Sequence, residues 1–504
     1  MEVITLGFQT LFSDFSVFLM MVFGVFLGII FGVIPGLTAT LGVTLMIPFT
    51  FTMTASQGLA LLVGIYVGGI AGSLITAILI NIPGTPASIA TVWDGYPMAK
   101  KGKATEALAL GVFASFVGGT VSAIALFTLA PMIAKAALNM QSWEMFAVCL
   151  MALVAVAAMT SEDMLKGLLG LFIGLLLGTI GMDMKLGTSR WTFGHWQLMN
   201  GIQATALMMS LFAIREILDQ VFNLGEIKEK IKVKRCSFIP PFNELKGEGW
   251  KALGIGSITG TILGILPGVG QNIAAIISYN QAKAVSKHPE KFGTGVPEGI
   301  VSCESSTNAV NGGSLIPLVT LGIPGDLVTA VLIGGLMIHG LQPGPRLFAD
   351  HPQIVGVIMA VYFVSNFVMY FMQLGLMRVF VKMIQVRLAY LFPAVIVFCV
   401  LGTFALNNFT FDIWVLIIFS VIGYILNQFQ INLITVILAF VLGPLIERYF
   451  QLGMNLAEGR LSGILERPIA VTFLIIAILF LFYPAASKQI QKYFVKKRAQ
   501  RVGE

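Results

Sequence analysis

One apolar stretch of the chain is interrupted in a way that a simple membrane-spanning helix is not. Residues 298–345 are hydrophobic enough for a lipid bilayer, yet glycines and prolines break the run repeatedly. Its polar and charged side chains include Glu304, Ser305, Thr307, Asn308, Asn311 and Asp326. Non-helical backbone at membrane depth occurs only where protein buries it or where it lines a water-filled cavity, and ionisable residues there usually serve function. The stretch therefore predicts a functional site within a membrane protein.

The same pattern occurs a second time, earlier in the chain. Residues 72–84 match residues 313–325 at an offset of 241 positions, through Gly-Ser and Pro-Gly pairs in the same order. Just upstream, residues 28–36 match residues 260–268 at an offset of 232 positions, through two glycines and a Pro-Gly pair. Two paired motifs in one order indicate an internal duplication. Paired hydrophobic segments broken by Gly and Pro are the best sequence indication of a secondary transporter's binding site.

Composition restricts the chain to the membrane-protein class. Its 504 residues are 57% hydrophobic and only 11% charged, with a mean hydropathy of +0.89, which is typical of a polytopic helical membrane protein. The net charge of +7 comes from basic residues in short loops and the C-terminal tail, so it indicates orientation in a bilayer and not nucleic-acid binding. The four cysteines are scattered without ligand-like spacing, so neither a disulfide framework nor a metal site is predicted.

Hydropathy predicts an all-α polytopic fold with about 10–12 transmembrane helices plus broken or re-entrant segments. We expect a first repeat half with its following spans (1–222), a basic cytoplasmic linker (223–250), a second repeat half with its following spans (251–487) and a basic cytoplasmic tail (488–504). The apolar segments lie near 15–34, 36–54, 57–81, 104–134, 143–159, 163–182, 197–222, 251–282, 299–323, 326–341, 352–381, 388–406, 411–427, 431–447 and 468–484. Whether 15–54 forms two spans or a hairpin is open at this level.

Loop charges favour an inverted relation between the two copies. Lys100, Lys101 and Lys103 close the first copy, whereas the equivalent loop of the second copy carries one Arg and one Asp. Between the motifs the pattern is reversed, with three lysines in the second copy and none in the first. Lys and Arg mark the cytoplasmic side of a membrane protein, so the copies are expected to have opposite orientations, with parallel repeats as the alternative.

Small or polar residues follow each of the four Pro-Gly breaks. A broken helix exposes backbone N–H groups where its second half starts, and the helix dipole favours anions there. Hydroxyls and amides can donate to a carboxylate, and freed carbonyls can bind Na⁺ or a water; the structural alternative is kinks and tight helix crossings. The candidate substrate-binding residues are Pro35, Gly36, Thr38, Thr40, Asn81, Pro83, Gly84, Thr85, Ser88, Gly268, Gln271, Asn272, Asn311, Pro324 and Gly325.

Glu304 is the most specific candidate for a functional residue, because a carboxylate inside a hydrophobic segment needs a partner. It could carry a coupling proton or bind Na⁺, or it could only form structural bonds with Ser305 and Asn308. Asp326 directly follows a break and could instead cap the next helix. The coupling-ion candidates, whose oxygens suit a hard cation, are Glu304, Ser305, Thr307, Asn308 and Asp326.

The motifs resemble those of the large membrane subunit of tripartite tricarboxylate transporters, the TctA family. The resemblance is carried by residues 32–42, 72–104, 264–274 and 311–345, and it extends over essentially the whole chain. It implies a bacterial inner-membrane permease that works with a small four-helix membrane subunit and a periplasmic solute-binding protein. It also implies tricarboxylate, dicarboxylate or other organic-anion substrates and, by analogy, elevator-type scaffold and transport domains.

These observations predict secondary active uptake of an organic carboxylate, driven by a Na⁺ or H⁺ gradient, by a multi-pass inner-membrane protein whose C-terminal tail is cytoplasmic. The alternative is a stand-alone symporter that needs no binding protein. No cofactor is expected, and the oligomeric state is open, with a homodimer among the alternatives. An intramembrane enzyme is disfavoured because no acid–base or nucleophile set converges. A channel is disfavoured because a two-fold inverted repeat suits alternating access.

Overall fold

The computed structural model describes residues 2–160, 163–183, 187–222, 239–384 and 388–482. These residues are almost entirely helical, and the strands among them form one two-stranded hairpin. The expected all-α fold is thereby confirmed. The predicted basic tail and most of the predicted basic linker (residues 223–238) lie outside the described residues.

The chain forms two compact units. The first comprises residues 1–138 and 204–424, and the second comprises residues 139–203 and 425–504. The halves expected from the sequence, 1–222 and 251–487, are consecutive stretches with one copy of the motif each. The first compact unit, in contrast, contains both copies. The candidate site therefore belongs to the first unit.

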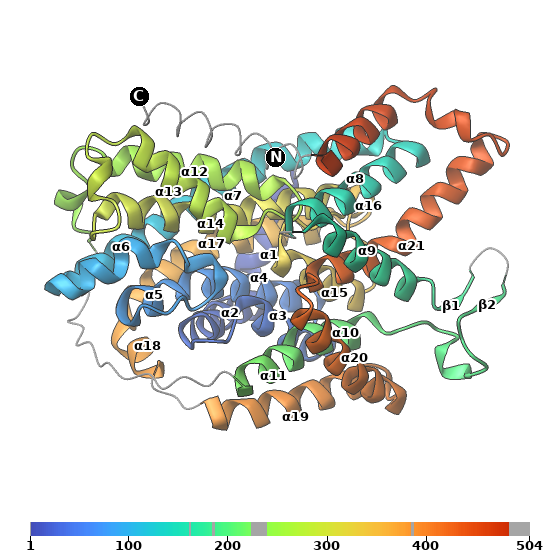
Figure 1. Cartoon of the computed structure of the whole chain (residues 1–504), viewed down its shortest axis with the longest axis horizontal. Coiled ribbons are helices and arrows are strands. Elements are labelled where there is room, and N and C mark those ends of the chain that lie inside the picture. The colour runs from blue at the N-terminus through green and yellow to red at the C-terminus, as the bar shows by residue number, and fades with distance from the viewer. Residues whose placement is uncertain (1, 161–162, 184–186, 223–238, 385–387, 483–504) are drawn as a thin grey trace, which may run out of the picture. The chain divides into compact units, whose positions relative to one another are not determined.

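The first unit is a bundle of helices of very different lengths (Figure 1). Its helices are α1 (Glu2–Ser13), α2 (Phe15–Val33), α3 (Ala39–Thr50), α4 (Ala55–Gly72), α5 (Leu74–Ile80), α6 (Thr91–Met98), α7 (Ala104–Leu138), α10 (Ala204–Met208), α11 (Arg215–Phe222), α12 (Gly249–Ile265), α13 (Gly270–Val285), α14 (Pro297–Leu321), α15 (Leu327–Ile338), α16 (Pro345–Asp350), α17 (Pro352–Gly375), α18 (Met377–Met383), α19 (Leu388–Asn407) and α20 (Thr410–Gln428), the last of which runs into the segment after residue 424. A π-helical segment, Met209–Ile214, joins α10 to α11, and a short 3₁₀ turn, η1 (Pro86–Ser88), precedes α6.

The second unit contains α8 (Ser142–Thr160), α9 (Met164–Gly178), β1 (Gly181–Met182), β2 (Ser189–Arg190), α21 (Leu433–Leu456) and an apolar helix, Pro468–Phe482. The strands are antiparallel, with Gly181 opposite Arg190 and Met182 opposite Ser189. Within this unit α21 packs against both α8 and α9.

The described helices include seven that are long and apolar enough to cross a membrane. They are Phe15–Val33, Ala55–Ile80, Thr91–Leu138, Ser142–Met159, Pro352–Gly375, Thr410–Gln428 and Leu433–Leu456. In this list α4 and α5 count as one span, and α6 and α7 as another. The protein is therefore a multi-pass membrane protein. α3 has 12 residues and is only about 18 Å long, whereas the hydrocarbon core of a bilayer is about 30 Å thick. The segment 15–54 is accordingly one full span followed by a short helix.

Each copy packs its first long helix against a later one through glycines. α2 contacts α4 in the first copy, and α12 contacts α14 in the second. A Cβ atom at Gly28 would collide with the backbone of Ile65, and one at Gly260 would collide with the backbone of Ser306. Ile65 and Ser306 are 241 positions apart, which is the offset of the sequence motifs. The two copies share this packing, while their opposite orientation stays a prediction.

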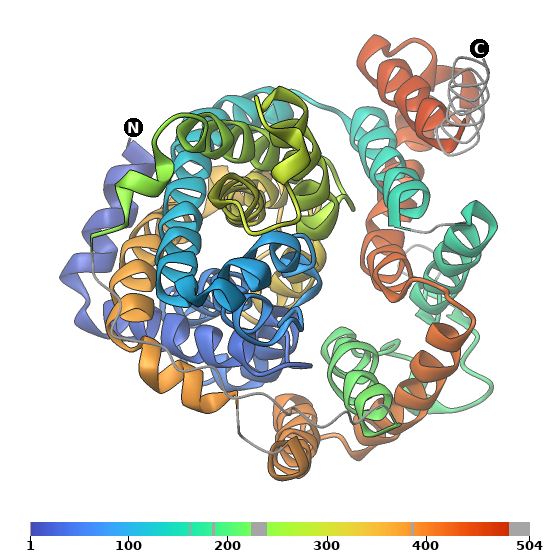
Figure 2. The same cartoon turned by 60° about the vertical axis from the view of Figure 1, so that its left-hand side comes forward.

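The long helix after each copy packs against the other copy. α7, which follows the first copy, contacts α14, and α17, which follows the second, contacts α4 (Figures 1 and 2). α6, α12 and α13 also pack against α14, and every residue from Gly299 to Thr320 is buried. The polar part of the central stretch thus lies inside the protein and not against lipid.

Candidate functional site

The helices are interrupted at all four predicted positions. Residues 34–38 separate α2 from α3, and residues 266–269 separate α12 from α13. The second breaks follow α5 and α14, at residues 81–85 and 322–326. Gly36 has a φ angle of 87°, in the left-handed region that glycine enters without the steric cost of a Cβ atom. The Pro-Gly pair at the first break therefore makes the turn itself.

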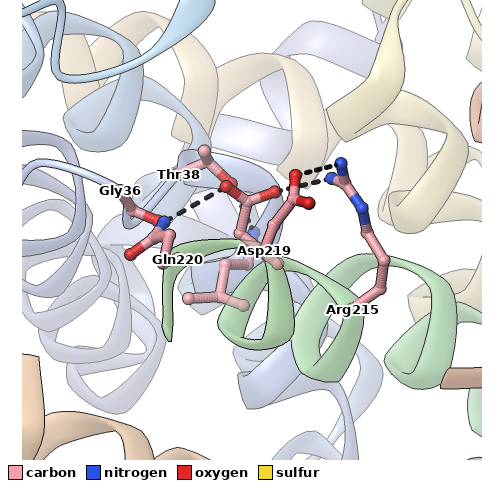
Figure 3. A network of polar contacts seen from close by, with 7 residues as sticks. Gly36, Thr38, Arg215, Asp219 and Gln220 are labelled. Carbon is pink, nitrogen blue, oxygen red and sulfur yellow. Dashed lines mark hydrogen bonds and ion pairs between the residues drawn. The ribbon is translucent and has the colours of Figure 1, made fainter. Parts of the chain in front are cut away.

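The first break lies against α11, as Figure 3 shows. Gln220 donates from Nε2 to the carbonyl oxygen of Gly36. On the same helix the guanidinium of Arg215 binds Glu216 at 2.9 Å and Asp219 at 2.6 Å. A protein donor thus occupies the carbonyl of Gly36.

A backbone hydrogen bond joins the two breaks of the second copy. The amide of Gly268 donates to the carbonyl of Gly325 at 2.9 Å. A Cβ atom on Gly325 would also collide with the carbonyl oxygen of Gly264, so this turn packs directly on α12. The breaks of the second copy therefore form one connected turn structure, and the carbonyl of Gly325 is also occupied.

Asp326 lies where donors from α4, α13 and α15 meet. Its Oδ1 accepts from the amide of Thr329 at 2.8 Å and from the Thr329 hydroxyl at 2.6 Å. Its Oδ2 accepts from the Tyr66 hydroxyl at 2.5 Å and from Nε2 of Gln271. Nε2 of Gln271 also lies 3.3 Å from Oδ1 of Asn311. Asp326 is the N-cap of α15, which is the capping role that the sequence offered for it.

These residues make a buried polar group that we call the aspartate cluster. Its members are Tyr66, Gln271, Asn311, Ser314, Asp326 and Thr329. The Tyr66 hydroxyl also lies 2.8 Å from Oγ of Ser314. The cluster links α4 of the first copy to α13, α14 and α15 of the second.

Glu304 forms a second polar group, the glutamate cluster, with Thr91 and Ser115. The side chain lies in the middle of α14 and Glu304 is only 1% exposed. Oε1 accepts from the Thr91 hydroxyl at 2.5 Å, and Oε2 accepts from the Ser115 hydroxyl at 3.1 Å. The two hydroxyls come from α6 and α7. Among the described residues no Lys, Arg or His forms an ion pair with this carboxylate.

The chain neighbours of Glu304 form hydrogen bonds with the backbone and not with its carboxylate. Nδ2 of Asn308 donates to the main-chain carbonyl of Glu304 at 3.1 Å, and the Thr307 hydroxyl donates to the same carbonyl at 3.1 Å. The Ser305 hydroxyl donates to the carbonyl of Ser302 at 3.4 Å. The alternative in which Ser305 and Asn308 bond to the Glu304 carboxylate is therefore not the arrangement seen, because these side chains reach back to main-chain carbonyls of their own helix.

Three buried side-chain oxygens near these clusters have no hydrogen-bond partner in the described part of the chain. They are Oγ1 of Thr85, Oγ of Ser306 and Oδ1 of Asn308. The main-chain carbonyl of Asn308, in contrast, accepts from the Tyr362 hydroxyl at 3.1 Å. A buried polar atom without a partner is costly, so such atoms point to places where a ligand can bind.

The remaining candidates have varied surroundings. Thr38 caps α3 by accepting from the amide of Leu41 at 3.1 Å. Ser88 donates its hydroxyl to the carbonyl of Thr85 at 3.1 Å, and Asn81 is exposed with a φ angle of 60°. Pro35, Pro83 and Asn272 are half-buried, and Thr40, Gly84 and Pro324 are buried.

The structure brings the candidates together in two clusters and not in one. Gln271, Asn311 and Asp326 share the aspartate cluster, whereas Glu304 belongs to the glutamate cluster. Sequence analysis missed Tyr66, Thr91, Ser115 and Gln220, which supply partners to the candidate residues. Tyr66 alone carried a signal, as a tyrosine within an otherwise apolar segment.

Comparison with known proteins identifies one family and two uncharacterized relatives. The profile of the tripartite tricarboxylate transporter TctA family matches residues 18–438. A protein of Agrobacterium vitis described as an uncharacterized 52.8 kDa protein in the TAR-I ttuC′ 3′ region is 34% identical over 501 residues, covering 98% of both chains. An uncharacterized protein in the TAR-II ttuC′ 3′ region of the same organism is 33% identical over 240 residues, covering 47% of this chain and 99% of its own. No solved structure matches the chain.

Proposed function

The chain belongs to the TctA family of tripartite tricarboxylate transporters, and from this premise we propose that it takes up an organic carboxylate across the bacterial inner membrane. Uptake is driven by a Na⁺ or H⁺ gradient. The chain acts as the permease subunit beside a small four-helix membrane subunit and a periplasmic solute-binding protein. A cytoplasmic C-terminal tail is part of this proposal, supported by the basic residues of the tail and the positive-inside rule.

The observation that carries the coupling step is the chemistry of the glutamate cluster. Both partners of the Glu304 carboxylate are hydroxyls, Thr91 and Ser115, and no cation pairs with it in the described part of the chain. A hydroxyl can donate to a carboxylate or accept from a carboxylic acid. The cluster can therefore hold Glu304 in either protonation state without rearrangement.

Asp326 differs because two of its partners can only donate. The backbone amide of Thr329 and Nε2 of Gln271 have no acceptor function, so they favour the ionised carboxylate. A hydrogen bond to a charged group contributes about 1.5–3 kcal/mol, so four donors compensate roughly twice as much of the desolvation cost as the two at Glu304. We therefore assign coupling to Glu304, and a structural role to Asp326.

The position of Glu304 explains how a bound cation can influence transport. Removing an ionised carboxylate from water costs several kcal/mol, and two hydroxyl donors at about 1.5–3 kcal/mol each leave part of that cost uncompensated. A proton or Na⁺ at Glu304 supplies the remainder. Because Thr91 and Ser115 lie on α6 and α7, binding and release of the cation change the stability of the contact between these helices and α14.

The experiment is Glu304→Gln in proteoliposomes that also contain the two partner subunits. The amide keeps the size of the side chain and removes the titratable group. We expect loss of gradient-driven accumulation of citrate or succinate, while exchange of substrate across the membrane partly survives. Imposing a Na⁺ gradient and a pH gradient separately on the parent protein identifies the coupling ion.

The matched control is Glu290→Gln, which makes the same change at a carboxylate that is 66% exposed. It should accumulate substrate like the parent. Accumulation by Glu304→Gln at the parental level, normalised to inserted protein, would show that Glu304 has no coupling role. A lower protein yield with unchanged accumulation per molecule would assign it a structural role only.

A further inference from the structure

The second breaks of the two copies have the same backbone but different chemistry. Asn81 and Gly322, 241 positions apart, end their helices with φ angles of 60° and 74°. Four residues later, Thr85 and Asp326 are both extended, with φ angles of −136° and −143°. The residue after the Pro-Gly pair is thus a neutral threonine in the first copy and a carboxylate in the second.

The carboxylate of Asp326 fills the break of the second copy. Asp326 is only 3% exposed, and its two oxygens accept from Thr329, Tyr66 and Gln271. All of the donors are protein groups. The break of the second copy therefore already holds an internal anion, which leaves it no role in binding the carboxylate of a substrate.

The equivalent place in the first copy lacks that carboxylate. Thr85 is only 4% exposed and its Oγ1 has no hydrogen-bond partner within the described residues. Its side chain does not cap η1, whereas Asp326 caps α15. A buried hydroxyl with no acceptor can donate a hydrogen bond to a ligand, and a carboxylate oxygen is a suitable acceptor.

The positions around Thr85 that correspond to the partners of Asp326 also carry smaller side chains. Applying the two sequence offsets, Gln271 corresponds to Ala39 and Tyr66 corresponds to Thr307. The hydroxyl of Thr307 is used on the main-chain carbonyl of Glu304. At the break of the first copy, the positions that correspond to Gln271 and Tyr66 therefore carry smaller side chains, Ala39 and Thr307.

We infer that a carboxylate of the transported organic anion binds at the first copy's second break, residues 81–85, in the place that Asp326 takes in the second copy. The Thr85 hydroxyl donates to it. The breaks thus differ in role, since one binds the substrate and the other is permanently occupied by the protein's own carboxylate. The inference rests on the proposed function for the identity of the ligand, and it narrows the substrate-binding candidates to one break.

Binding of citrate and of succinate to the purified protein, measured by titration calorimetry without any gradient, tests this inference separately from transport. Thr85→Val keeps the shape of the side chain and removes the hydroxyl, so we expect binding to weaken at least about tenfold, the loss of one hydrogen bond to a charged group. Thr85→Ser keeps the hydroxyl and should bind within twofold of the parent. Thr85→Asp supplies the internal carboxylate and should abolish binding.

A labelling measurement covers the case in which a variant does not fold. Thr85→Cys should react with an anionic thiol reagent, and citrate should slow that reaction. Parental affinity in Thr85→Val or Thr85→Asp, no protection by citrate, or no binding of either carboxylate to the parent would each overturn the inference. Failure of the proposed function is a different result, because it would appear as binding without gradient-driven accumulation.

Discussion

Two buried tyrosines allow the charge of Asp326 to be tested by stability alone. The hydroxyl of Tyr66 bonds to Oδ2 of Asp326 at 2.5 Å and to Oγ of Ser314 at 2.8 Å. The hydroxyl of Tyr362 bonds to the carbonyl of Asn308 at 3.1 Å and to a serine hydroxyl, Ser122, at 2.8 Å. Both tyrosines are 0% exposed. Nε2 of Gln271 also donates weakly to the Tyr66 hydroxyl, at 3.3 Å. Substitution by Phe therefore removes the same atom from two buried polar surroundings, whose main difference is a carboxylate acceptor at Tyr66 and a carbonyl acceptor at Tyr362.

The expected magnitudes follow from the difference between a charged and a neutral acceptor. A hydrogen bond to a charged group contributes about 1.5–3 kcal/mol to stability, and a neutral one about 0.5–1.5 kcal/mol. Within membranes, hydrogen bonds between helices average only about 0.6 kcal/mol and reach about 1.7 kcal/mol. We expect Tyr66→Phe to lower the free energy of unfolding by about 1–1.5 kcal/mol more than Tyr362→Phe, roughly a fivefold to tenfold change in the equilibrium constant.

The assay is equilibrium unfolding in mixed micelles with increasing sodium dodecyl sulfate, followed by circular dichroism. A double-mutant cycle with Asp326→Asn isolates the pairwise interaction. In the Asp326→Asn background, Tyr66→Phe should cost no more than Tyr362→Phe does in the parent. Two results would refute an ionised Asp326, and with it the contrast drawn with Glu304. One is an equal loss of unfolding free energy for the two Tyr→Phe variants of the parent. The other is a loss for Tyr66→Phe that is the same with and without Asp326→Asn.

Two further outcomes test the packing and the orientation of the copies. Gly260→Ala places a Cβ atom against the backbone of Ser306 and should destabilise the fold by about 1–3 kcal/mol in the same unfolding assay. Gly254→Ala on the same helix meets nothing within 4 Å and should be neutral or stabilising by up to about 1 kcal/mol. Similar costs for both variants would show that the α12–α14 contact is not tight. Lys100→Cys and Gln342→Cys, both at exposed positions, should react with an impermeant thiol reagent from opposite faces of the membrane, and labelling from the same face would favour parallel repeats.

Local sequence patterns predicted the helices and their breaks, because both depend on residues that are close along the chain. Hydropathy placed α7, α8 and α17 within a few residues, and the Pro-Gly pairs located all four interruptions. The segment 251–282 was predicted as one apolar run, yet the structure divides it into α12 and α13. The break motif of residues 264–268 had already marked that division, so hydropathy averaged over a window concealed what the Pro-Gly pair revealed.

Partners of buried polar groups could not be predicted in this way. Thr91 and Glu304 are 213 positions apart, and Tyr66 and Asp326 are 260 positions apart. No periodicity connects such residues, since their meeting depends on how α6 and α4 pack against α14 and α15. Sequence analysis therefore recognised Glu304 as a group that needs a partner, but the protein partners it could name were chain neighbours, Ser305 and Asn308, which bond to backbone instead.

The internal duplication offers a comparison that a single copy could not. At the second breaks, Asn81 and Gly322 are both left-handed and Thr85 and Asp326 are both extended, yet Glu304 corresponds to Val63 and Asp326 corresponds to Thr85. A symmetric binding site would need the same chemistry in both copies. Instead the carboxylates of both clusters lie in the second copy. Asp326 accepts from two donor-only groups and two hydroxyls, and Glu304 accepts from two hydroxyls, while the Thr85 hydroxyl of the first copy has no acceptor within the described residues. The proposed roles of the two copies therefore differ: in our proposal Glu304 of the second copy provides the negative charge that a cation neutralises, and Thr85 of the first copy provides the donor for a substrate anion.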